Sequence, residues 1–298
     1  MFRSILIVIL LISHSAFAKK LAITFDDSPR HAKGHFDGRT RAKKLIKNLK
    51  KHNAGDVVFF SVSGQIDKEG RERLQKYADA GHTIANHTAT HPNFNETAPS
   101  EYKDNFEKAH NVLKEFSTFK KWFRFPYLRE GNTKEKRDGM RSALRDMSYR
   151  NAYITLNNYD WYIETIFQRA VKSPNFNFDK MRDFYVNVLV ESVEYYDKMA
   201  VEHLGRSPKH VLLLHEMDIS ALFIGDLIEA LRKNGWQIIS TENAYTDEIA
   251  NYETQAFFPF NPGRIGEIAK DKGQTNGLWH ESCDEQYLEE RFKREVLP

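Results

Sequence analysis

Residues 21–29 read LAITFDDSP, an apolar run that ends in two adjacent carboxylates and then a turn. The segment 20–25 has the apolar and β-branched composition of a buried strand. Successive strand side chains point to opposite faces, so Asp26 and Asp27 would diverge if the strand continued regularly through them. Because the strand ends there, we expect both acids to reach one cleft and to perform different tasks. An Asx-type turn leading into Pro29 would explain one acid, but less easily both.

Similar short apolar runs recur along the chain and alternate with longer charged segments of helical periodicity. The predicted strands are residues 20–25, 56–62, 83–85, 122–125, 152–155, 211–214 and 236–239. The predicted helices are residues 40–52, 69–80, 100–116, 133–147, 178–203 and 221–234. This alternation predicts an α/β fold with parallel strands, either a barrel or an open doubly wound sheet.

The amino-terminal segment 1–18 has the features of a secretory signal peptide. Arg3 precedes the apolar run 5–12, and residues 16–18 read AFA, the small-x-small pattern of a cleavage site. The apolar run is much shorter than the ~20 residues that span a bilayer, which disfavours the alternative of a membrane anchor. We therefore expect cleavage after Ala18 and an exported protein, either periplasmic or secreted.

The composition of the chain is that of a globular protein, with nearly equal numbers of basic and acidic residues. Lysine and arginine number 44 against 41 acidic residues, so there is no electrostatic reason to expect a nucleic-acid partner. The single cysteine, Cys283, cannot form an intramolecular disulfide, so stability must come from the hydrophobic core. We expect one main domain over residues 19–250 and a tail over 251–298 packed on it. We also expect a monomer, with no stable membrane insertion after signal cleavage.

Ionisable side chains follow the predicted strands at the points where several strands end. They are Asp26, Asp27, His87, His91, Arg124, Asp160 and His215. The carboxyl ends of parallel strands share one face, and sites form there. We therefore expect these side chains to converge in one pocket.

The spacing of His87 and His91 indicates a metal site. On a helical turn, side chains four residues apart lie on the same face. Two neutral imidazoles and a carboxylate make a three-ligand set for one metal ion. Taken alone the pair is a weak signal, since two surface histidines are the commoner outcome, but the acid pair upstream favours a metal. One of Asp26 and Asp27 would bind the metal and the other would accept a proton from the attacking water.

Two further strand ends carry candidate catalytic groups. Arg124 ends an apolar strand, where a buried guanidinium needs an anion such as Asp26; an ordinary surface arginine is the alternative. His215 follows the buried run VLLL. It is either a satisfied core histidine or a general acid whose pKa is raised by Asp160. Trp161, next to Asp160, would line the cleft or simply pack.

Five motifs together resemble those of the NodB-homology polysaccharide deacetylases, carbohydrate esterase family four. They are TFDD, HTATH, RFPY, YDW and LLLH, in this order. The resemblance extends from around Leu21 to Ala244. It implies a distorted (β/α) barrel with about seven parallel strands. It also implies a divalent metal, usually zinc with cobalt, nickel or manganese as alternatives, and removal of acetyl groups from a polysaccharide.

The resemblance also implies roles for the first half of the site. Asp27, His87 and His91 correspond to the metal ligands. Asp26 corresponds to the catalytic base, and Arg124 to the residue that orients it.

Further roles are implied for the second half of the site. The backbone N–H of Tyr127 corresponds to an oxyanion donor. His215 corresponds to the acid that protonates the leaving amine, and Asp160 to its partner. Tyr127, Trp161 and Leu213 correspond to substrate-binding residues, the last two forming an apolar pocket for the acetyl methyl group.

The chain departs from the family pattern at three positions near the site. Ser28 and Leu128 stand where glycine is frequent, and Asn157 replaces an acid often found three residues before the Asp160 position. We expect these changes to affect the shape of the cleft and the choice of substrate more than the chemistry.

The sequence therefore predicts an exported, metal-dependent deacetylase of an N-acetylglucosamine polymer, with peptidoglycan first because of the predicted compartment. Chitin oligosaccharides, an exopolysaccharide and acetylated xylan are the alternative substrates. A carbohydrate-binding pseudo-enzyme is less favoured because every catalytic position is filled. A non-haem iron oxygenase also uses two histidines and a carboxylate, but it would need neither Arg124 nor His215.

Overall fold

The computed structural model describes residues 18–32 and 34–297. The predicted signal peptide, residues 1–18, lies outside the described residues except for Ala18. Within the described part, no helix combines the length and the apolar character needed to cross a membrane.

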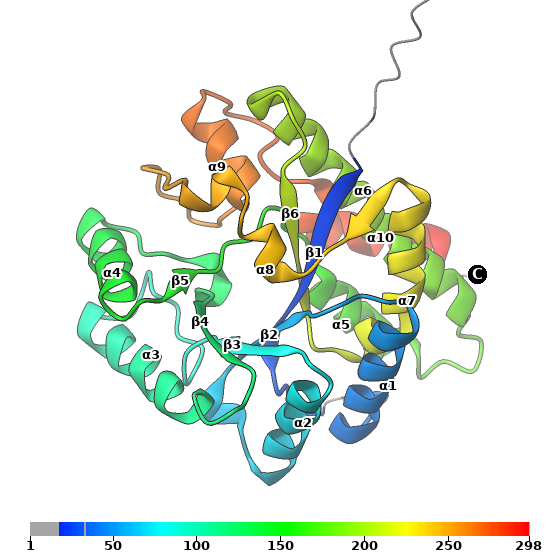
Figure 1. The fold of residues 1–298 in the computed structure, drawn as a ribbon. Coiled ribbons are helices and arrows are strands. Elements are labelled where there is room, and N and C mark those ends of the chain that lie inside the picture. The colour runs from blue at the N-terminus through cyan, green and yellow to red at the C-terminus, as the bar shows by residue number, and fades with distance from the viewer. Residues whose placement is uncertain (1–17, 33, 298) are drawn as a thin grey trace, which may run out of the picture.

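Parallel strands form the centre of the molecule, and helices surround them (Figure 1). The strand order is β5-β4-β3-β2-β1-β6, and β7 pairs with the beginning of β1. Every one of these pairings is parallel. The strands are β1 Lys19–Ser28, β2 Val58–Ser61, β3 Thr83–Asn86, β4 Phe119–Phe123, β5 Arg150–Asn151, β6 Lys209–His215 and β7 Trp236–Ile238. The predicted α/β fold with parallel strands is confirmed.

The sheet curls into a distorted barrel because β6 is bonded on both of its edges. On one edge it pairs with β1, in a register that sets Asp26 directly beside His215. On the other edge Leu212 forms an isolated parallel bridge with Leu156, in the segment that follows β5. This closure brings the carboxyl ends of the first and last long strands together, which positions the site.

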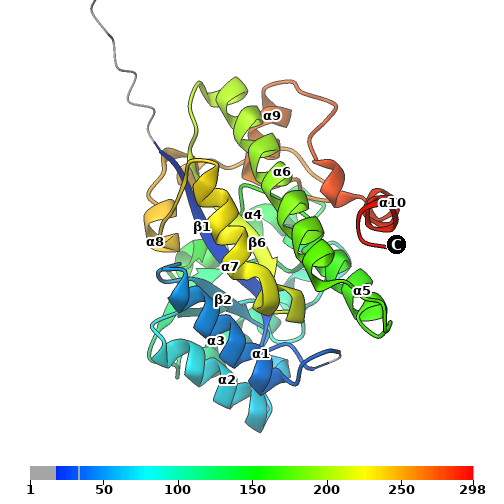
Figure 2. The same ribbon diagram turned by 90° about the vertical axis from the view of Figure 1, so that its right-hand side faces the viewer.

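Helices form the outer layer of the fold. They are α1 Gly38–Lys51, α2 Lys68–Asp79, α3 Pro99–Leu113, α4 Lys134–Asp146, α5 Asp160–Ala170, α6 Phe178–Leu204, α7 Asp218–Lys233, α8 Thr241–Ala244, α9 Arg264–Asp271 and α10 Glu285–Glu295. Helices α6 and α7 pack side by side, and α10 lies against α5 and α6 (Figure 2). Short 3₁₀ turns connect the longer elements: η1 Ser63–Gln65, η2 Pro126–Leu128, η3 Glu248–Asn251 and η4 Glu281–Cys283.

Local sequence signals set several helix boundaries. The Asp37 and Asp67 side chains accept hydrogen bonds from the first turns of α1 and α2, which satisfies backbone donors that have no partner inside the helix. Gly81 and Gly235 follow the ends of α2 and α7 with φ of 86° and 84°, a conformation that glycine adopts without strain.

The structure corrects three boundaries that the sequence pattern predicts. Strand β4 begins at Phe119 rather than at residue 122, since its first residues include two lysines at the exposed end of the strand. The predicted strand 152–155 is displaced, because the ladder with β4 ends near β5 and the chain then crosses to β6. Helix α5 is absent from the prediction, because its aromatic segment lacks a clear charged face.

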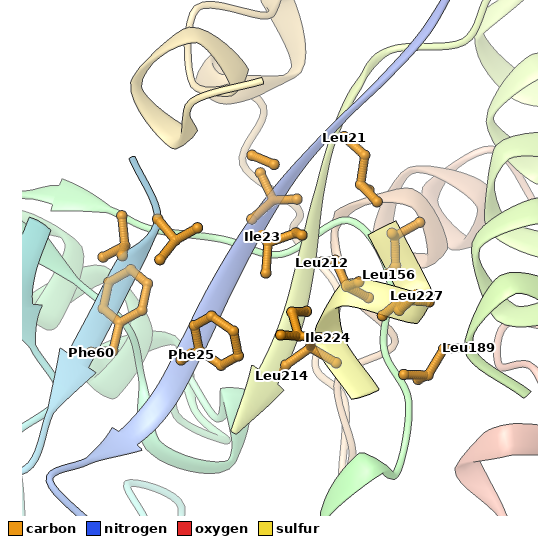
Figure 3. Packing of buried hydrophobic residues seen from close by; sticks show 14 of the residues in the cluster. Leu21, Ile23, Phe25, Phe60, Leu156, Leu189, Leu212, Leu214, Ile224 and Leu227 are labelled. Atoms are coloured by element: carbon orange, nitrogen blue, oxygen red, sulfur yellow. The ribbon is translucent and has the colours of Figure 1, made fainter. Parts of the chain in front are cut away.

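The main core lies between the β1–β6 pair and the helices that cover it (Figure 3). Leu21 and Phe25 of β1, Leu212 of β6, and Ile224 and Leu227 of α7 are all fully buried. Strands buried on both faces read as continuous apolar runs, which is why LAITF and VLLL lack the alternation of a surface strand.

A buried ionic network fixes the chain that follows β6. Glu216 is fully buried and accepts hydrogen bonds from Arg73 at 3.0 Å, Tyr77 at 2.8 Å and Arg41 at 3.3 Å. It also accepts a hydrogen bond of 2.7 Å from the backbone N–H of Arg30, just beyond the acid pair. One carboxylate thus ties the ends of β1 and β6 to α1 and α2.

Neutralising this carboxylate should destabilise the fold strongly. We expect Glu216→Gln to lower the free energy of unfolding by about 3–5 kcal/mol, because Arg41 and Arg73 would lose the fully buried carboxylate that they share and would each keep only one acidic partner. Glu72→Gln is the control: Glu72 pairs with Arg39 at the surface, where solvent screens the pair, so its loss should change the free energy of unfolding very little. Urea denaturation measures both changes, and equal effects would contradict this role for Glu216.

Candidate active site

The two adjacent acids reach one cleft because the backbone adopts a left-handed conformation at Asp27. Thr24 and Asp26 both accept hydrogen bonds from Arg124, so they share the inner face of β1. Asp27 has φ of 66°, in the left-handed region that few residues other than glycine adopt. This turn breaks the alternation of the strand, and both carboxylates line one cavity of about 450 Å³.

Asp27, His87 and His91 converge on one point of this cavity. The Oδ1 atom of Asp27 lies 3.7 Å from Nε2 of His87 and 3.3 Å from Nε2 of His91. One possible ligand atom from each residue lies within 4.8 Å of the others. The Nδ1 atom of His87 is hydrogen-bonded to the carbonyl oxygen of Arg124 at 2.8 Å, which assigns the proton to Nδ1 and leaves Nε2 free to bind a metal.

The donor set fits a divalent cation. The buried Oδ1 atom of Asp27 has no hydrogen-bond partner among the described residues, an arrangement that is costly without a ligand. Burial lowers the pKa of His87 and of His91 to about 4, so both rings are neutral at pH 7, as metal binding requires. Burial opposes ionisation of Asp27, but His215, the two other histidines and Arg30 together outweigh it and lower the pKa of Asp27 to about 2.

The turn that carries the two histidines differs from the predicted helical turn. Residues 87–92 form no helix, and Thr88 and His91 have φ of 67° and 57°. The Thr88 hydroxyl accepts a hydrogen bond of 3.0 Å from the backbone N–H of His91, which holds the turn closed. The two rings still meet, with centroids 4.9 Å apart.

Asp26 is held by a buried guanidinium. Arg124 Nη1 donates to Asp26 Oδ1 at 3.0 Å, and Arg124 Nε donates to the carbonyl oxygen of Ala152 at 2.5 Å. The guanidinium also lies 4.2 Å above the centroid of the Phe60 ring. Burial raises the pKa of Asp26 above its ordinary value, and Arg124 opposes that rise only in part. A carboxylate with a raised pKa in a fixed orientation is suited to accept a proton.

Asp160 fixes His215 through both its ring and its backbone. Asp160 Oδ1 lies 2.7 Å from His215 Nδ1, and Asp160 Oδ2 accepts the His215 backbone N–H at 2.7 Å. Burial opposes protonation of His215, but the Asp160 carboxylate outweighs it and raises the pKa of His215 to about 9. The ring is therefore protonated at neutral pH, as a general acid must be.

Non-glycine residues with left-handed backbone gather around the cavity. They are Asp27, Thr88, His91, Tyr127 and Leu128, and only two other described residues, Asn53 and Ser148, share this conformation. Backbone of this kind costs about 1–3 kcal/mol per residue and is concentrated at functional sites. The cluster therefore marks the cavity as functional independently of its side chains.

The structure brings all of the predicted site residues into or directly behind this cavity. Tyr127 is 53% exposed at the rim and packs edge-on against His91 at 4.5 Å. Trp161 and Leu213 line the wall near His215. Arg124 and Asp160 lie behind the residues they contact.

Several residues that line the cavity are missing from the sequence prediction. Tyr159 is the first residue of the YDW motif and Arg129 lies two residues beyond RFPY, but the sequence prediction gives neither of them a role. Phe260 comes from the predicted tail over residues 251–298, for which the sequence prediction names no site residue.

Removing one ligand should empty the metal site. We expect His87→Ala to lower the content of bound zinc from one ion per chain to much less than one, because two ligands remain. His110→Ala, on α3 outside the cavity, is the matched control and should keep full occupancy. Elemental analysis after dialysis against zinc measures both, and unchanged stoichiometry in His87→Ala would remove that residue from the site.

Comparisons with known proteins agree with these motifs. A family model described as "Polysaccharide deacetylase" matches residues 15–152. A curated relative, the peptidoglycan-N-acetylglucosamine deacetylase of Bacillus cereus, is 28% identical over 109 residues. That match spans 36% of this chain and 36% of the relative's length. The family resemblance predicted from the motifs is confirmed.

Solved structures show the same fold. The polysaccharide deacetylase Bc1974 from Bacillus cereus matches with a TM-score of 0.54 and 20% identity, covering 82% of this chain and 96% of that one. The peptidoglycan deacetylase PdaC from Bacillus subtilis matches with a TM-score of 0.51 and 19% identity, covering 77% and 91%. At this identity the likeness confirms the distorted barrel and carries no statement about substrate.

Proposed function

Because residues 15–152 place this chain in the polysaccharide deacetylase family, we propose that it removes N-acetyl groups from an N-acetylglucosamine-containing polymer. Peptidoglycan is the first candidate, since the curated relative is named for that substrate. One observation carries the proposal. Asp26, which Arg124 orients, and His215, which Asp160 orients, line one cavity together with the three candidate metal ligands. Chitin oligosaccharides, exopolysaccharides and acetylated xylan remain the alternative substrates.

We assign the binding of a divalent cation to Asp27, His87 and His91, and two nitrogens with one oxygen favour zinc over cobalt, nickel or manganese. Bound there, such an ion would polarise the acetyl carbonyl and make water a stronger nucleophile at neutral pH.

The residues of the chain account for the proton transfers. Asp26 accepts a proton from the attacking water, and Arg124 keeps its carboxylate oriented. The backbone N–H of Tyr127 donates to the carbonyl oxygen as negative charge develops, an interaction typically worth about 3 kcal/mol. His215 gives its proton to the departing nitrogen, and Asp160 stabilises the imidazolium beforehand. Water and the N-acetyl group thus become acetate and a free amine.

We also propose that the whole chain divides into three parts, as the sequence predicts. Residues 1–18 would direct export and be removed, and residues 19–250 would form the deacetylase domain. Residues 251–298 would act as a tail packed on that domain. Export to the periplasm or the exterior would bring the enzyme to cell-wall or extracellular polysaccharides.

Replacement of the base should abolish turnover while sparing the metal site. We expect Asp26→Asn to lower kcat by about 10²–10⁴-fold, because the amide cannot accept the proton of water. Release of acetate from N-acetylglucosamine oligomers measures the activity, and elemental analysis checks that zinc remains. Near-normal turnover in the substituted enzyme would disprove the role of Asp26.

The pH profile should report the proton on His215. Its acid form exists below its pKa of about 9, so activity should fall as the pH rises through about 9. Asp160→Asn removes the charge that raises this pKa, so the alkaline limb of kcat/KM should move to lower pH. An alkaline limb at the same pH in both enzymes would show that another group sets it.

A further inference from the structure

The tail contributes an aromatic ring to the catalytic cavity. Phe260 lies between η3 and α9 and lines the same cavity as His215. Its ring packs edge-on against Tyr159, with centroids 5.6 Å apart, and Tyr159 lies 4.9 Å from Trp161. We call Tyr159, Trp161 and Phe260 the aromatic wall. Trp279, also from the tail, stacks behind Phe260 at 6.0 Å.

The aromatic wall is held in place by specific contacts. The carbonyl oxygen of Asn261, next to Phe260, accepts a hydrogen bond of 2.8 Å from the Asn157 side chain. The Asn261 side chain donates to Glu267 at 2.8 Å and accepts from the backbone N–H of Gly263 at 2.7 Å. Gly263 has φ of 88°, and a side chain there would lie 3.2 Å from the backbone of the barrel. Phe260 is therefore fixed before any ligand binds, which reduces the entropy lost on binding.

Asn157 is also one of the positions at which the chain departs from its family pattern. An ionised carboxylate at this position has no N–H group, so it could not donate to Asn261 and would repel its carbonyl oxygen. The Asn157 amide can therefore hold the tail at Asn261, which a carboxylate at this position could not do. The other end of the tail is tied to the wall as well, because the Tyr159 backbone N–H donates to the Ser282 carbonyl oxygen at 3.0 Å.

We propose that Phe260, the ring that the tail adds to the aromatic wall, packs against a sugar ring next to the one that loses its acetyl group, so that the tail sets the preference for long oligomers. This inference rests on the proposed deacetylase function. The wall is continuous with the cavity that holds His215, so a polymer with one unit at the catalytic groups must pass an adjacent surface. Flat aromatic rings offer apolar area at little entropic cost, and the C–H faces of a sugar ring fit such a surface.

The experiment compares acetate release from N-acetylglucosamine oligomers of increasing length with hydrolysis of 4-nitrophenyl acetate, which has no sugar. We expect Phe260→Ala to lower kcat/KM for long oligomers about tenfold through KM, the effect of one lost ring contact. Its kcat/KM for 4-nitrophenyl acetate, which has no second ring to contact, should fall by a clearly smaller factor. Phe257→Ala is the matched control, since that ring is 46% exposed in the same tail and does not line the cavity.

Two further variants distinguish loss of the Phe260 ring contact from a general loss of folded structure. Phe260→Trp should keep the preference for long oligomers, and Asn157→Asp should weaken it, because the hydrogen bond to the carbonyl oxygen next to Phe260 would be lost. A length dependence that is the same in Phe260→Ala and in the unsubstituted enzyme would overturn the inference.

Binding distinguishes this inference from the proposed function. If the unsubstituted enzyme releases no acetate from any oligomer, the proposed function fails. Quenching of tryptophan fluorescence by the same oligomers still tests the wall, because Trp161 and Trp279 lie in and behind it. Loss of length-dependent quenching in Phe260→Ala supports the wall, and unchanged quenching contradicts it.

Discussion

Two neighbouring carboxylates buried side by side are stable only if each has its own counter-charge. Asp26 obtains it from Arg124, a guanidinium that is itself held by backbone carbonyl oxygen and by the face of Phe60. Asp27 turns away through a left-handed backbone conformation toward His87 and His91, and its counter-charge comes from Arg30 at 3.5 Å and from the protonated His215. Burial of a charge without a partner is costly. Because Asp26 and Asp27 have different partners, they are suited to different roles. Every other feature of the site is arranged around this pair.

The barrel supplies the remaining geometry through strand register. Pairing of β1 with β6 sets His215 beside Asp26, so the proposed base and acid occupy neighbouring strands of one sheet. The residue after His215 is the buried Glu216, whose ionic network holds the ends of both strands to α1 and α2. The proposed catalytic side chains thus lie at or near rigid strand ends, while the proposed substrate-facing surface comes from loops and from the tail.

Much of this arrangement could be predicted from the sequence because it depends on short-range patterns. Apolar runs that end in ionisable residues predicted that Asp26, His87 and His215 lie at strand ends. Helical periodicity predicted six of the helices. The non-helical turn around His91 could not be predicted, because its left-handed residues are stabilised by contacts within the fold. Phe260 could not be predicted either, since its place in the cavity depends on a hydrogen bond between residues far apart in the chain.

The central claim is that Asp27 binds a cation while Asp26 remains free to accept a proton. Anomalous X-ray diffraction at the zinc absorption edge, from crystals of the zinc-loaded protein, tests this claim most directly. The account predicts one strong peak within bonding distance of Asp27 Oδ1, His87 Nε2 and His91 Nε2, with Asp26 still paired to Arg124. A peak bonded to Asp26, or one located away from the two histidines, would contradict it.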